Sequence, residues 1–99
     1  MVGCVTVTVL TPADITATDI MATPSGDPCI EGICTVDVEV TWTNNGEATG
    51  TIEPNITIDG VPATPLPTAN VEGYGGTLTR TFTVTGLGTG SYEICPDPN

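Results

Sequence analysis

The most constraining stretch of the chain runs from residue 34 to residue 44, where apolar and polar residues alternate. Successive side chains of a β-strand point to opposite faces, so this pattern predicts one buried face and one solvated face. The apolar face carries Val36, Val38, Val40 and Trp42. Asn45-Gly46 follows as a turn signal. The stretch predicts a central strand of an antiparallel β-sandwich, with Trp42 as the largest core side chain.

Similar but shorter alternations predict further strands at residues 2–10, 14–23, 51–59, 61–66, 77–85 and 91–95. A change of parity between Ala17 and Ile20 predicts a bulge near Thr18-Asp19. Asp59-Gly60 predicts a tight hairpin turn, and the segment 96–99 is not expected to continue a sheet. No helical periodicity occurs. The predicted fold class is an all-β, antiparallel β-sandwich of about seven strands.

Charge excludes several classes of partner. The chain of 99 residues carries a net charge of −11, with Arg80 as its one cation. Such a surface repels phosphate backbones and anionic lipid heads, so no nucleic-acid or membrane-surface binding is expected. No run of 18 apolar residues occurs, so no membrane insertion is expected. Arg80 has inward parity and is expected to lie at a sheet end, where it pairs with a carboxylate.

Four cysteines in a small chain without histidine predict two disulfides rather than a zinc site. Cys29 and Cys34 are close in sequence and predict a local disulfide. Cys4 and Cys95 both have polar-face parity, so a second disulfide is permitted, within one chain or between two chains. Disulfides imply an extracellular or cell-surface location. No metal or cofactor is expected.

No catalytic group stands out. The chain has no histidine and no lysine, and no free cysteine is expected, so general-base and nucleophile chemistry lack their usual residues and an enzyme is not expected. The segment 55–57 forms a glycosylation sequon. Parity turns Asn55 outward, which makes it a candidate glycosylation site.

Several motifs together resemble a known domain family. They are ADITATDI (13–20), VEVTWTNNGEA (38–48), ITIDG (56–60), TLTRTFTV (77–84), GSY (90–92) and DPN (97–99). With these motifs, residues 13–99 resemble the CARDB (cell-adhesion-related) domain of bacterial and archaeal surface proteins. The resemblance implies an immunoglobulin-like sandwich and a non-enzymatic surface module.

The chain departs from that family at both ends. CARDB domains usually have a further last strand, beside the strand that matches residues 91–95. Here that strand is missing, and an extra strand is predicted at residues 2–10. The expected organisation is therefore an N-terminal strand (1–12) followed by an immunoglobulin-like domain (13–99), with the first segment a candidate to fill the vacant position.

The linker of residues 11–13 restricts how the first strand can fill the vacant position. A strand of this length is roughly 25 Å long, whereas Thr11-Pro12-Ala13 spans only about 10–14 Å. An antiparallel placement in the chain's own vacant position would end too far from Asp14. Either the strand enters its own sheet in parallel, or it completes a neighbouring subunit by donor-strand complementation, as in pilins.

Two functions follow from these alternatives. The first is a structural subunit of an extracellular filament or pilus, a homopolymer joined head to tail through core contacts of Val5, Val7 and Val9. The second is a spacer or cell-adhesion module of a larger cell-surface protein, folded as a monomer, with a glycan or another surface molecule as its partner.

Overall fold

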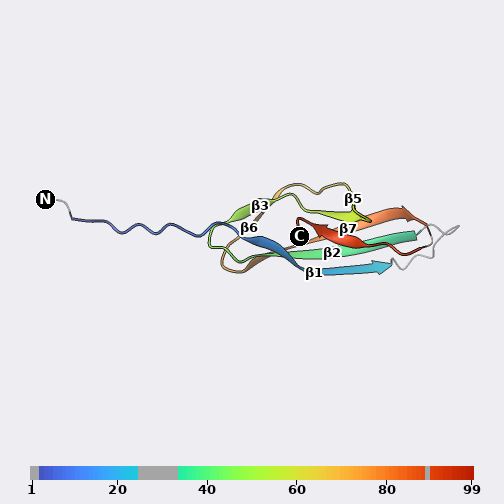
Figure 1. The fold of residues 1–99 in the computed structure, drawn as a ribbon, viewed down its shortest axis with the longest axis horizontal. Coiled ribbons are helices and arrows are strands. Elements are labelled where there is room, and N and C mark those ends of the chain that lie inside the picture. The colour runs from blue at the N-terminus through green and yellow to red at the C-terminus, as the bar shows by residue number, and fades with distance from the viewer. Residues whose placement is uncertain (1–2, 25–33, 89) are drawn as a thin grey trace.

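The computed structural model describes residues 3–24, 34–88 and 90–99, and in these ranges every regular element is a β-strand (Figure 1). The strands are β1 (Ile15–Pro24), β2 (Cys34–Asn44), β3 (Gly50–Ile52), β4 (Asn55–Ile58), β5 (Val61–Pro62), β6 (Ala69–Val71), β7 (Gly76–Leu87) and β8 (Ile94–Asp97). All pairings are antiparallel. The all-β fold class is confirmed. The described ranges hold eight strands rather than about seven. One predicted strand is divided and one predicted loop contains β6, whereas residues 3–10 of the predicted first strand form no regular element.

The first layer is a sheet with the order β1–β2–β7, and β2 has the predicted bounds. Its apolar stripe is buried as expected, with Val38, Val40 and Trp42 fully inaccessible. The register between β1 and β2 shifts between Ala17 and Asp19, which confirms the predicted bulge. Below the shift Ala17 lies opposite Trp42, and above it Ile20 lies opposite Val40, so the bulge returns apolar residues to the core face.

The second layer consists of two smaller sheets, β5–β4–β8 and β3–β6. The predicted strand 51–59 is divided at Pro54, whose missing N–H cannot join a ladder. The chain therefore changes partner, from β6 before Pro54 to β5 and β8 after it. Asp59 and Gly60 both have positive φ (51° and 81°), as a two-residue hairpin turn requires, so the predicted turn is confirmed.

The core lies between the two layers and is built around Trp42. Its ring meets the ring of Phe82 edge to face, with centroids 6.5 Å apart and an interplanar angle of 72°. The indole N–H donates a 2.7 Å hydrogen bond to the carbonyl oxygen of Pro98. The other buried apolar residues are Val38, Val40, Ile52, Ile56, Val71 and Leu78. This arrangement fixes the residues after β8 against the centre of the sandwich.

The last strand differs from its prediction, because β8 includes Pro96 and Asp97. Asp59 N donates to Glu93 O at 2.8 Å. Since bonded pairs alternate along an antiparallel ladder, the hydrogen-bonded pairs with β4 are Thr57–Cys95 and Asn55–Asp97. Pro96 turns its missing N–H away from β4, and the strand can continue through it.

Arg80 does not make its predicted ion pair. It lies opposite Val40 in the middle of the β2–β7 ladder, away from the sheet ends where a carboxylate was expected. In the part of the chain that the structure describes, its guanidinium donates to the carbonyl oxygen of Thr79 at 3.0 Å. The prediction of a carboxylate partner is wrong, because the neighbouring carbonyl is the acceptor within reach.

Candidate functional site

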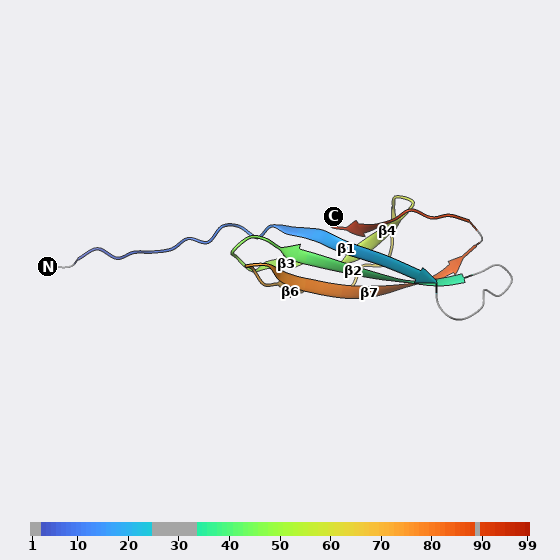
Figure 2. The same cartoon turned by 90° about the horizontal axis from the view of Figure 1, so that it is seen from below.

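Residues 3–12, here called the arm, project from one end of the sandwich in an extended conformation (Figures 1 and 2). Val5, Val7 and Val9 are 89%, 79% and 84% exposed. Within residues 3–10 the predicted N-terminal strand forms no ladder with any described part of its own chain. The arm therefore presents an unpaired backbone and an apolar stripe to solvent. A β-strand that lacks neighbouring strands has these two properties.

The base of the arm is held firmly by the loop after β2. Thr11 N donates to Glu47 Oε1 at 2.9 Å, and Glu47 N donates back to Thr11 Oγ1 at 3.0 Å. Thr11 O accepts from Ala48 N at 3.0 Å. Asp14 N donates to Asn44 Oδ1 at 3.0 Å, and Asp14 O accepts from Asn45 N at 2.8 Å. These five bonds aim the arm away from the sandwich.

The second half of β1 exposes core-facing positions. Residues directly opposite in an antiparallel pair share a face, so Ile20 faces the core with Val40, and Ala22 faces it with Val38. Both valines are fully buried, yet Ile20 is 37% exposed and Ala22 is also exposed. We call Ile20 and Ala22 the open face, because no described strand of the second layer covers them.

A hollow of about 350 Å³ adjoins the open face, between β1 and the residues at the end of the chain. Its lining residues are Ala17, Thr18, Asp19, Ile20, Pro96 and Asn99. β8 pairs with β4 on one side, and no described strand pairs with its other edge. This free edge borders the hollow, because Pro96 of β8 is one of the lining residues. By the alternation described above, the backbone groups of Ile94 and the carbonyl oxygen of Pro96 point to this edge. The site therefore offers both an apolar face and unpaired hydrogen-bonding groups.

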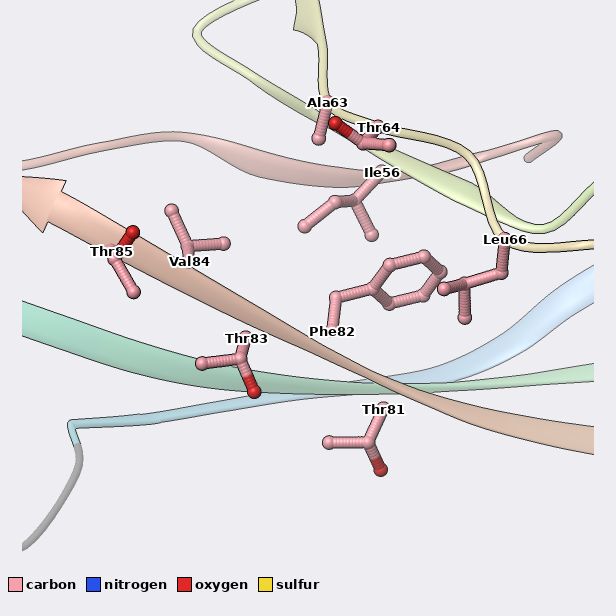
Figure 3. Close-up of a pocket in the computed structure, with 9 residues that line it drawn as sticks. All are labelled: Ile56, Ala63, Thr64, Leu66, Thr81, Phe82, Thr83, Val84 and Thr85. Atoms are coloured by element: carbon pink, nitrogen blue, oxygen red, sulfur yellow. The ribbon is translucent and has the colours of Figure 1, made fainter.

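A second hollow of about 380 Å³ lies between β7 and the segment after β5 (Figure 3). Its interior is formed by Ile56, Leu66, Phe82 and Val84, which point toward one another in Figure 3. Ile56 and Phe82 are already buried in the single chain. The segment beside them is bonded to β4 and its approach, through Ala63 N to Ile56 O and Leu66 N to Pro54 O (both 2.9 Å). Leu66 and Val84 are partly buried, so none of the four interior side chains is exposed, whereas Ile20 and Ala22 of the open face are.

The cysteines fall into two groups. Cys34 is disulfide-bonded, and its predicted partner Cys29 lies outside the described residues. Cys4 and Cys95 are free thiols. Cys4 is exposed on the arm, whereas Cys95 lies in β8, with Sγ 3.6 Å from Glu93 Oε1 on the solvent side of the strand. The fold does not bring these two together within one chain.

Asn55 is buried, although an accessible side chain is predicted. Its side chain is only 7% exposed. Asn55 Nδ2 donates to Ala63 O at 3.0 Å, and Asn55 Oδ1 accepts from Ile56 N at 2.8 Å. Asn55 pairs with Asp97 and so keeps the predicted face of the strand. It is inaccessible because its amide bonds to Ala63, in the segment that follows β5. A glycan on this nitrogen would require the bond to Ala63 to break.

Other kinds of site were sought in the described ranges. There, no group of three or more His, Cys, Asp or Glu residues is placed to hold a metal ion, and no helix is long and apolar enough to cross a membrane. Among known proteins, no family model, no curated protein and no solved structure matches the chain. Sequence reasoning missed the open face, although its signal was present in the parity of Ile20 and Ala22 after the bulge.

Proposed function

We propose that this protein is a non-enzymatic structural subunit of an extracellular filament, and that it polymerises head to tail by placing its arm on the open face of the next subunit. The observation that carries the proposal is a complementarity within one chain. Val5, Val7 and Val9 form an apolar stripe without a cover. Ile20 and Ala22 are core positions without a cover. A second copy of the chain supplies what each lacks.

The direction of the arm supports a linear assembly. The arm leaves the sandwich on the side from which β1 begins and continues roughly along the long axis of the molecule (Figures 1 and 2). A copy shifted along this axis, without turning, brings its arm to the far end of the first sandwich, pointing inward. Such a contact joins two different surfaces and does not close on itself, so repetition builds a filament.

Apolar burial supplies a sufficient driving force. Burial of an exposed valine contributes about 1.5–3 kcal/mol, so three valines contribute roughly 4–9 kcal/mol before the costs of association and ordering are subtracted. Hydrogen bonds with the free edge of β8 add to this. Because the costs are of similar size, the loss of one valine is expected to decide whether the filament forms.

Charge also favours the arm as the contact element. Residues 1–13 contain no charged side chain, whereas all 12 acidic residues and Arg80 lie from Asp14 onward. The body of each subunit therefore repels other bodies, and the neutral arm can approach an acidic neighbour without this penalty. The disulfide-bonded state of Cys34 supports a location outside the reducing cytosol.

The proposal is tested by two matched substitutions in the arm, followed by size-exclusion chromatography and negative-stain electron microscopy. Val7→Asp places a charge on the apolar stripe and is expected to leave monomers. Thr8→Asp adds the same charge on the opposite face of the arm, and this variant is still expected to form fibres. Wild-type protein that stays monomeric at high concentration, with no fibres, would overturn the proposal and favour a spacer or adhesion module.

A further inference from the structure

We infer that each donated arm is locked covalently into its acceptor by a disulfide between Cys4 of one subunit and Cys95 of the next. This inference rests on the proposed function and adds a defined register to it. Both residues are free thiols in the single chain. Four features of the fold bring them together in the assembly, and the anchored base of the arm keeps them apart in the monomer.

The first feature is strand direction. β1 runs away from the arm, and β8 returns toward it (Figures 1 and 2). The arm of a copy shifted along the long axis therefore runs parallel to β1 and antiparallel to β8. Antiparallel addition to the free edge of β8 extends the β5–β4–β8 sheet over the open face.

The second feature is the face on which each cysteine lies. When Val5, Val7 and Val9 turn toward Ile20 and Ala22, the alternation of the arm turns Cys4 to the solvent side. Cys95 is on the solvent side of β8, where its Sγ contacts Glu93 Oε1. Both thiols thus lie on the same face of the extended sheet, as a cross-strand disulfide requires.

The third feature is the hydrogen-bonding pattern of β8. Cys95 bonds with Thr57 of β4, so its backbone groups are used on that side. Toward an added strand, Cys95 occupies a non-hydrogen-bonded position. Residues in such pairs have Cα atoms about 4.5 Å apart, within the range of about 4.4–6.8 Å that a disulfide spans.

The fourth feature is the set of pairs that this register creates on either side. Val5 meets Ile94, an inward residue packed on the core, and can exchange both backbone hydrogen bonds with it. Gly3 meets Pro96, whose ring stands where an N–H would otherwise be. Gly3 has no side chain to collide with that ring, and its Cβ position is open in the free chain.

The same bond within one chain is disfavoured. The base of the arm is fixed at Thr11 by three hydrogen bonds to Glu47 and Ala48. Cys4 lies seven residues outward on a segment that leads away from β8 (Figure 1). An internal disulfide would require this anchored segment to reverse its direction.

Formation of the bond is an oxidation, for which we name a disulfide as the oxidant. The Cys4 thiolate attacks one sulfur of the oxidant disulfide and releases one thiolate. The Cys95 thiolate then attacks the mixed disulfide at the Cys4 sulfur and releases the second. The two cysteines lose two electrons and two protons in total, and the oxidant is reduced to two thiols.

Oxidised glutathione and non-reducing electrophoresis test the inference. Wild-type fibres are expected to give a ladder of covalent oligomers that dithiothreitol collapses to one band. Cys4→Ser and Cys95→Ser are each expected to lose the ladder when assembled alone. When the two variants are mixed, each Cys95→Ser chain can donate to one Cys4→Ser chain, so the mixture is expected to stop at covalent dimers.

A register control is available on the same face of the arm. The double variant Cys4→Ser/Thr6→Cys moves the thiol two residues along, opposite Glu93 and out of reach of Cys95, and is expected to lose at least nine-tenths of the crosslinked product. Dimers formed by either single variant alone would show a Cys4–Cys4 or Cys95–Cys95 contact and would overturn the inference. Equal crosslinking by the control would overturn it as well.

Fibre formation by Cys4→Ser/Cys95→Ser separates this inference from the proposed function. Fibres without crosslinks in the wild type would overturn only the disulfide. Absence of fibres in both the wild type and the double variant would overturn the proposed function together with the disulfide.

Discussion

Ile20 and Val40 lie directly opposite each other in the β1–β2 ladder and face the same side of the sheet, yet Val40 is fully buried and Ile20 is 37% exposed. The difference arises because the second layer covers the centre of the sandwich and leaves the end of β1 uncovered. In the proposed filament, this accessible core position is where the arm of the next subunit binds.

Replacement of Ile20 by serine is expected to weaken assembly at least about tenfold, because about 1.4 kcal/mol of apolar contact with the incoming arm is lost. Met21→Ser is the matched control. Met21 pairs with Glu39 and points to the outer face of the sheet, where it is already 58% exposed. The measurement is the critical concentration for fibre formation by light scattering, and an equal effect of both substitutions would contradict the assignment of the open face.

Assembly is expected to become faster and tighter as salt concentration rises. The bodies carry a net charge of −11 and repel one another, and the Debye length falls from about 30 Å at 0.01 M to about 10 Å at 0.1 M salt. Light scattering at several NaCl concentrations measures this effect. Slower assembly at higher salt would mean that ion pairs between subunits hold the filament, contrary to an apolar strand contact.

Gly46→Ala is expected to disturb the base of the arm. A Cβ atom at position 46 would overlap the carbonyl oxygen of Pro12, a backbone atom that cannot move without shifting the arm. We expect a loss of about 1–3 kcal/mol in the free energy of unfolding, together with reduced fibre formation. Gly88→Ala, where the nearest atom is Tyr92 Oη at 3.9 Å, serves as the control and should behave as wild type.

Asn44→Ala is expected to lower the free energy of unfolding by about 3 kcal/mol or more. Its buried amide accepts from Asp14 N and Gly46 N and donates to Ala48 O and Val71 O. Removal of the amide leaves these groups unsatisfied. Asn70→Ala removes one exposed bond to Thr51 and should cost less than about 1 kcal/mol. Urea unfolding followed by Trp42 fluorescence measures both, and equal values would contradict the account.

The sequence predicted β2 to the residue, the bulge in β1 and the turn at Asp59-Gly60, because each depends on neighbouring residues only. It failed for Asn55, Arg80 and the extent of β8. Asn55 keeps its predicted face but is buried, because its amide bonds to Ala63 in the segment that follows β5. Pro96 joined β8 because its missing N–H faces an unpaired edge. These outcomes depend on which strands meet, and local patterns do not contain that information.

For the candidate site, too, some features could be predicted from the sequence and others could not. The apolar stripe of the arm was readable from alternation, and the short linker already argued against antiparallel pairing with its own sheet. The open face was not identified, since the exposure of Ile20 depends on where the second layer ends. The parities of Cys4 and Cys95 permit a disulfide, but the proposal that it joins two chains rests on the anchored base of the arm, which the sequence does not show.

The most direct test of strand donation is a filament structure by electron cryomicroscopy, at a resolution that separates strands and shows large side chains. The account predicts that residues 3–10 of one subunit lie antiparallel beside β8 of the next, with Val7 over the open face and Cys4 opposite Cys95. An arm folded onto its own sandwich, or seated in the hollow beside Phe82 and Leu66, would contradict it.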